Sequence, residues 1–190
     1  MAIRFIDKIT TPDTNKIRNL PDAAGIAYDT VTGQLFYNDA GTLRSLTAGV
    51  SAPVAATTTL ALASATHAGK TVTLGAVAGF TTTLPAATGS GAKYRLVVAT
   101  TLTSAAYIVA PTGNDLMFGG VIVNNTGDST PTEADFFPTA VDSNTFTFAF
   151  SAGAGVKGDW VEFEDIAADS WAVSGAIQAG VDPTSPFSAV

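Results

Sequence analysis

The chain has 190 residues, with nine Lys and Arg, 16 Asp and Glu, one His and no Cys, and its formal net charge is −7. This length fits one ordinary domain, or one domain with a small appendage. The lack of cysteine excludes disulfide frameworks, thiolate nucleophiles and zinc–thiolate or iron–sulfur sites. The excess of acid disfavours nucleic acid as a partner of the whole molecule.

Small uncharged residues dominate the composition, with 33 Ala, 28 Thr and 18 Gly. The charged fraction of 13% is about half of the ~25% usual in soluble domains. This composition argues against helical bundles and disorder, and favours a rigid β-structure with a neutral surface. No run approaches the ~20 apolar residues of a membrane span, and charges at Arg4, Asp7 and Lys8 leave no apolar signal region. We therefore expect no membrane partner and synthesis in a cytoplasm.

The first part of the chain carries a different charge balance from the rest. Residues 1–46 have a net charge of zero, residues 47–190 have −7, and the first 18 residues have four basic side chains against two acidic ones. Residues 2–6 alternate like a short strand, and 7–24 contain the prolines and asparagines of an extended arm. The arm is either a docking segment or an ordinary surface strand with scattered charges.

Residues 26–46 predict a small β-meander. Gly33 and Gly41 supply the positive φ that hairpin turns need between the alternating strand residues. Three such short strands cannot bury both faces alone, so they must pack on the body or on copies of themselves. We place the boundary of this N-terminal arm and meander at residue 47, with the body covering residues 48–190.

The body reads as a series of short strands separated by turns. Residues 48–59 form a linker or a flat strand, and 124–135 a polar loop. The predicted strands are 60–64, 70–74, 80–84, 93–101, 105–110, 116–123, 145–150, 159–166 and 170–177. No window shows a helical period. The pattern predicts an all-β protein whose body is a β-sandwich or barrel, jelly-roll-like, behind an N-terminal extended arm and meander.

Short motifs suggest little chemistry. Gly69-Lys70-Thr71 ends like a phosphate-binding loop, but the required earlier glycine is Ser64 and a strand follows, so a turn is the better interpretation. His67 has no neighbouring carboxylate and is interpreted as a turn residue. Gly89-Ser90-Gly91 is interpreted as a tight turn.

The densest acid cluster consists of Asp159, Glu162, Glu164, Asp165 and Asp169. It suits calcium or a glycosidase pair, but solvated acids on an outer strand face are commoner. We predict no catalytic residue, no metal and no cofactor.

Alternation along 159–166 places Trp160, Glu162 and Glu164 on one face and Val161, Phe163 and Asp165 on the other. We expect Val161 and Phe163 to point into the core. The Trp160 indole then needs cover from a neighbouring strand or another subunit, so we expect it at such a contact and not on a sugar.

Several stretches resemble virion proteins of tailed bacteriophages. GIAYDTVTGQLFYNDAGTLRSL (25–46) is similar to meanders of phage fibres and adaptors. The stretches 67–123 and 157–177 resemble the body of head decoration proteins, through TLPAATGSGAKYR (83–95), DLMFG (115–119) and KGDWVEF (157–163) in that order. Phe118 stands where the family has a smaller residue, which affects packing detail.

The resemblance implies a non-enzymatic capsid decoration, or cement, protein. It implies a homotrimer that binds the major capsid protein on the outer capsid surface of the virion after synthesis in the bacterial host cytoplasm. The residues expected on the capsid are Ile3, Arg4, Phe5, Ile6, Lys8, Lys16 and Arg18, and those expected between copies are Tyr28, Phe36, Tyr37 and Trp160. The alternative function is a receptor- or glycan-binding module of a tail fibre or adhesin, which would require Trp160 or Trp171 on the surface.

Overall fold

The computed structural model describes residues 52–126, 134–149, 153–180 and 183–189, together with the backbone of three strands nearer the N-terminus. The chain divides into two compact units, Met1–Val50 and Ser51–Val190. The sequence-based boundary at residue 47 falls three residues before this division. Each unit is described by itself.

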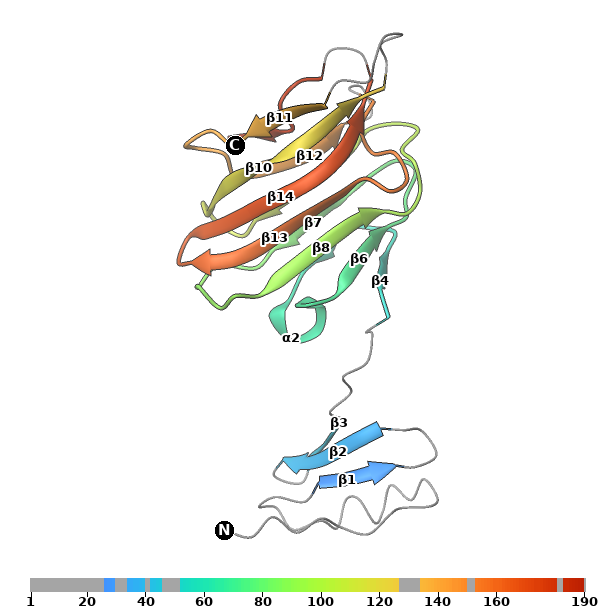
Figure 1. Cartoon of the computed structure of the whole chain (residues 1–190), viewed down its shortest axis with the longest axis vertical. Coiled ribbons are helices and arrows are strands. Elements are labelled where there is room, and N and C mark those ends of the chain that lie inside the picture. Colours follow the sequence, from blue (N-terminus) through green and yellow to red (C-terminus); the bar gives the residue numbers. More distant parts are fainter. Residues whose placement is uncertain are drawn as a thin grey trace. The chain divides into compact units, whose positions relative to one another are not determined.

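The first unit contains an antiparallel three-stranded sheet (Figure 1). Its strands are β1 (Ile26–Asp29), β2 (Gln34–Asp39) and β3 (Thr42–Ser45). Tyr28 pairs with Leu35, and Phe36 pairs with Ala27 and Ser45. The predicted strands of the meander are present. Gly33 and Gly41, which were predicted to form the turns, lie outside the described residues.

The second unit is a sandwich of two mixed sheets (Figure 1). The seven-stranded sheet has the order β11-β10-β14-β13-β8-β6-β4, and the five-stranded sheet has the order β15-β12-β9-β7-β5. The strands of the larger sheet are β4 (Val54–Ala56), β6 (Thr71–Leu74), β8 (Lys93–Val98), β10 (Leu116–Asn125), β11 (Ala134–Pro138), β13 (Trp160–Ala167) and β14 (Ser170–Ala179). Those of the smaller sheet are β5 (Leu60–Ala61), β7 (Thr81–Leu84), β9 (Ala106–Pro111), β12 (Thr145–Ala149) and β15 (Phe187–Ser188). The predicted all-β sandwich is confirmed.

The first six strands of the body wind alternately between the two sheets. β4, β6 and β8 lie side by side in parallel in one sheet, and β5, β7 and β9 do the same in the other. β10 and β14 are also parallel. These connections differ from those of a purely antiparallel jelly roll. Each strand from β4 to β9 is followed by a strand in the opposite sheet, and no hairpin joins two of these strands within one sheet.

The core lies between the sheets and is rich in aromatic rings. Phe146 is fully buried and meets Phe148, Phe163 and Phe187 edge to face at centroid distances of 4.8, 6.2 and 5.4 Å. Val161 and Phe163 are both 0% exposed, which confirms their predicted inward orientation on β13. Trp171 is likewise fully buried and packs against Tyr94 at 5.8 Å.

Three local predictions were wrong. The strand expected over 60–64 ends at Ala61, and residues Ser64–His67 form a single helical turn, α2. That turn is closed locally, because the Ala63 N–H donates to His67 Nδ1 at 2.9 Å. β10 extends to Asn125 and β11 begins at Ala134, so both strands overlap the ends of the loop predicted over 124–135. The short strand β15 was not predicted. No helix in the described part of the chain is long and apolar enough to cross a membrane.

The aromatic core gives a first test with a matched control. Phe146→Ala should lower the free energy of unfolding by about 3–5 kcal/mol, because it removes a ring from a closed core and leaves a cavity. Phe136→Ala changes the same side chain where it is 63% exposed, and should cost less than about 1 kcal/mol. Urea unfolding of both variants measures the difference, and equal costs would contradict the packing described.

Candidate functional site

The most distinctive surface is the outer face of the seven-stranded sheet, meaning the face that points away from the five-stranded sheet. Strand register arranges its side chains in rows that cross the strands. We define the apolar row as Phe136, Ile122, Ala176, Trp160 and Val97. Two further rows, the charged rows, contain Ser174, Glu162 and Arg95 in one and Phe118, Ala172, Glu164 and Lys93 in the other.

The apolar row is largely open to solvent at its β11 end. Phe136 is 63% exposed and Ile122, directly opposite it on β10, is 51% exposed. Phe118 is exposed on the same face, near the other end of β10. Adjacent exposed apolar side chains of this size are typical of an interaction surface.

Trp160 lies in the apolar row on β13, the central strand of the sheet, and is half-buried. The guanidinium carbon of Arg95, on the adjacent strand β8, lies 4.2 Å from the centre of its ring. This distance is typical of a cation–π contact. The cover predicted for the indole is therefore supplied, at least on one side, by a neighbouring strand of the same chain.

The charges of the outer face are arranged as opposed pairs on β8 and β13. Glu162 is directly opposite Arg95, and Glu164 is opposite Lys93. The Lys93 Nζ and Glu164 Oε2 atoms lie 3.0 Å apart. The hydrogen bond and charge of Glu164 raise the pKa of Lys93 above its ordinary value. The predicted outward orientation of both glutamates agrees with their partial exposure.

Asp165 has a structural role that the sequence analysis missed. Its carboxylate is 3% exposed and binds the turn between β7 and β8. Oδ1 accepts the N–H groups of Thr88 and Gly89 at 2.9 and 2.6 Å. Oδ2 accepts the Thr88 and Ser90 hydroxyls and the Ser90 N–H at 3.1, 2.6 and 3.1 Å. Burial alone would raise the pKa of Asp165, but these hydrogen bonds outweigh it and lower the pKa from 3.8 to about 2.

Asp159 anchors the opposite end of β13. Its Oδ2 accepts the N–H groups of Gly155 and Val156, both at 2.9 Å, and its Oδ1 accepts the Gln178 N–H of β14 at 2.9 Å. Burial nevertheless raises its pKa above 3.8, against the effect of these three bonds. The interpretation of the whole acid cluster as solvated is therefore wrong for Asp159 and Asp165. The available signals were the glycines that precede Asp159 and, for Asp165, its place on the core-facing side of its strand.

The remaining motifs are turns, as predicted. Gly69, Gly89 and Gly91 all have positive φ, and β6 begins at Thr71 without a preceding phosphate loop. His67 lies in α2, where its Nδ1 is engaged by the Ala63 N–H. The residues that the structure describes contain no group of three His, Cys, Asp or Glu side chains arranged to hold a metal.

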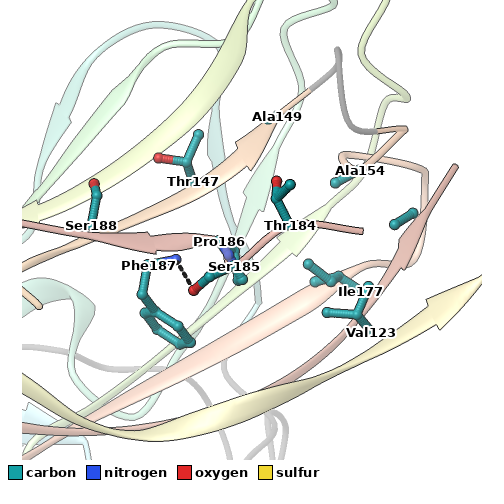
Figure 2. Close-up of a pocket in the computed structure, with 11 residues that line it drawn as sticks. Val123, Thr147, Ala149, Ala154, Ile177, Thr184, Ser185, Pro186, Phe187 and Ser188 are labelled. Carbon is teal, nitrogen blue, oxygen red and sulfur yellow. Dashed lines mark hydrogen bonds between the residues drawn. The ribbon is translucent and has the colours of Figure 1, made fainter. Parts of the chain in front are cut away.

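One cavity lies between the ends of the two sheets (Figure 2). It has a volume of about 190 Å³ and is lined by Val123, Thr147, Ala149, Ala154, Ile177, Ala179 and residues 184–188. The Phe187 N–H donates a hydrogen bond to the Ser185 hydroxyl at 3.2 Å. This bond is the dashed line in Figure 2. The described residues of the lining are apolar or hydroxyl-bearing, and none of them is ionisable.

The other predicted contact residues cannot be compared with the structure. The capsid-contact residues Ile3, Arg4, Phe5, Ile6, Lys8, Lys16 and Arg18 lie outside the described residues. Tyr28, Phe36 and Tyr37 lie in β1 and β2, where only the backbone is described. Their role between copies stays a prediction.

The chain matches no family model, no curated protein and no solved structure. The functional argument therefore depends on the motifs and on the geometry given above.

The opposite pKa directions of the two buried aspartates predict opposite pH effects. Asp165 stabilises the fold above pH 3.8, and that contribution is lost as the pH falls from 3.8 through about 2. Asp159, whose pKa is raised, favours the folded state in its protonated form, so its contribution falls as the pH rises above 3.8. In Asp165→Asn, the free energy of unfolding should fall less steeply than in wild type as the pH drops below 3.8. In Asp159→Asn, the decrease in the free energy of unfolding that wild type shows as the pH rises above 3.8 should be smaller.

Urea unfolding at a series of pH values measures both slopes. Asp165→Asn should also cost more than about 2 kcal/mol at neutral pH, because several charge-assisted hydrogen bonds are lost. Asp142→Asn, at an exposed loop position, is the matched control and should change the free energy of unfolding at neutral pH by less than about 0.5 kcal/mol. An Asp165→Asn profile parallel to that of wild type below pH 4 would contradict the role given to this carboxylate.

Proposed function

We propose that this chain is a non-enzymatic structural protein of the bacteriophage virion. It binds the outside of the assembled capsid as a decoration protein and stabilises contacts between major capsid protein subunits. Its copies act as a homotrimer, as the resemblance implies. Synthesis takes place in the cytoplasm of the bacterial host, and the capsid surface is the final location.

One structural observation supports this proposal above others: the stretches that carry the resemblance lie together in space. The loop within 83–95 is bound from two directions. The Asp115 carboxylate, at the start of the stretch 115–119, accepts the Ala87 N–H at 2.6 Å. Asp165, two residues beyond the stretch 157–163, holds residues 88–90. Stretches far apart in the sequence therefore form one connected part of the fold, which supports interpreting them together.

The polar residues of these stretches are engaged in holding the fold. The carboxylates of Asp115, Asp159 and Asp165 are each 5% exposed or less and accept backbone N–H groups. A general acid or base must reach a substrate proton, and carboxylates committed in this way have little freedom to do so. This arrangement favours a structural protein over the weaker alternative of a hydrolase that uses the acid cluster.

The positions of the two tryptophans favour decoration over glycan binding. Sugar-binding modules stack a pyranose ring on an open aromatic face. Trp171 is completely buried, and Arg95 lies over the ring of Trp160. The glycan-binding alternative therefore loses Trp171, and it would have to use a Trp160 ring that Arg95 already covers on one face.

The N-terminal arm is the proposed capsid contact. Its apolar residues Ile3, Phe5 and Ile6 and its excess of basic side chains complement an acidic, partly apolar surface. Burial of three such apolar side chains contributes roughly 5 kcal/mol per copy before ordering costs. In a trimer, three arms acting together bind more tightly than one through effective concentration.

Co-sedimentation with undecorated, expanded capsids tests this function. The full chain should pellet with the capsids, and a variant lacking residues 1–20 should remain in the supernatant because it has lost the contact. The thermal melting curve of the truncated protein controls for folding. Full capsid binding by the truncated variant would place the contact on the body, and no binding by the full chain would reject the function.

A further inference from the structure

The outer face of the seven-stranded sheet combines an apolar row with a balanced set of charges. Of the four basic residues in 47–190, two, Lys93 and Arg95, project from β8 on this face. Glu162 and Glu164 project beside them from β13. The net charge of these four residues is zero, whereas residues 47–190 together carry −7. Two copies therefore repel each other least where this face meets a like face.

The order of the charges matches the requirements of a two-fold interface. In an isologous contact, residue i of one copy meets residue j of the other, and j meets i. On the outer face, the acids occupy one strand and the bases occupy the adjacent strand at the same heights, since Glu162 pairs with Arg95 and Glu164 with Lys93. A half-turn about an axis that runs parallel to the strands, midway between β8 and β13, keeps those heights and exchanges the two strands.

We propose that a second copy of this chain packs on the outer face about this two-fold axis. Glu162 then faces Arg95 of the partner subunit, and Glu164 faces Lys93 of the partner subunit, each pair occurring twice. The same rotation places Trp160 over Val97 of the partner subunit and Ile122 over Ala55 of the partner subunit, since these residues share one row across the sheet. In this arrangement each acidic side chain faces a basic one of the partner subunit, and apolar side chains face apolar side chains.

The size of the face sets the expected strength of the contact. The rotation lays β10, β14 and β13 over the shorter β4, β6 and β8 of the partner subunit, which have three, four and six residues, and leaves β11 without a counterpart. At about 4.8 Å between strands and about 3.3 Å per residue, this overlap forms a patch of roughly 400 Å² on each copy. Two such patches bury roughly 800 Å², below the range for stable interfaces, so the contact is a weak one. Sheets packed face to face lie about 10 Å apart at about −30°, so the central strands β8 and β13 stay opposed while the outer strands diverge. The pairing is therefore concentration-dependent and centred on the two charged strands.

Charge reversal on the full-length chain tests this geometry. An acid-reversed variant carries Glu162→Lys and Glu164→Lys, and a base-reversed variant carries Lys93→Glu and Arg95→Glu. Each variant places like charges opposite one another, so each should halve the mass of the wild-type oligomer in sedimentation equilibrium. An equimolar mixture of the two variants should restore the wild-type mass, because every reversed residue then faces its opposite.

Two controls separate position from net charge and from folding. Asp135→Lys with Asp142→Lys changes the net charge as much as the acid-reversed variant does, at exposed positions outside the rows, and should keep the wild-type mass. Thermal melts of all variants verify the fold. A variant that combines all four reversals restores opposed charges within one chain and should regain the wild-type mass without mixing.

Tryptophan fluorescence provides a second measurement on the same samples. Trp160 should shift its emission to the blue as the protein concentration rises, because the partner covers its free side, while the buried Trp171 stays constant. Trp160→Phe should abolish this shift.

Wild-type protein that stays monomeric up to millimolar concentration would overturn the proposal. It would also be overturned by reversed variants that keep the wild-type mass, or by a mixture that fails to restore it. A wild-type hexamer that becomes a trimer in each charge-reversed variant would support the proposal, because only the two-fold contact between copies is lost. Capsid binding is measured separately and can fail or succeed independently of these results.

Discussion

The body depends on buried carboxylates that bind backbone amides at turns. Asp165 accepts five hydrogen bonds from residues 88–90, and Asp159 accepts three at the other end of β13. A charge buried without such partners costs several kcal/mol, so the carboxylates and the turns must form together. These bonds join β13 to the loop between β7 and β8 and to β14. The turns that close the sandwich therefore depend on these carboxylates as well as on their own glycines, such as Gly89 and Gly155, which have positive φ.

The winding of the chain determines which surfaces remain free. Because β4 to β9 cross alternately between the sheets, the inward side chains of both sheets fill one core, and no other described strand of the second unit covers the outer face of the larger sheet. Ala172, Ser174 and Ala176 of β14 are small, so this face stays shallow between Phe118 and Ile122 on one side and the charged residues of β8 and β13 on the other. A flat face suits another sheet better than it suits a small ligand.

Alternation within strands was readable from the sequence, whereas strand pairing was not. Val161 and Phe163 were placed correctly because a period of two depends only on neighbouring residues. That period is the same for parallel and antiparallel neighbours, so it could not reveal the parallel winding of β4 to β9. The contact between Trp160 and Arg95 joins residues 65 positions apart and follows only from the register of β8 on β13. The strand β11 was missed because Asp135 and Pro138 resemble loop residues, and edge strands tolerate both.

A single strand, β13, thus separates two kinds of interaction by the direction of its side chains. Its inward residues Val161, Phe163 and Asp165 hold the core and a turn, and substitutions there act on the free energy of unfolding. Its outward residues Trp160, Glu162 and Glu164 contribute little to the core, because they are only half-buried. Substitutions at these outward positions are therefore expected to change the free energy of unfolding less than substitutions at the inward positions. The proposed contact between copies uses the face of β13 that contributes least to the stability of the fold.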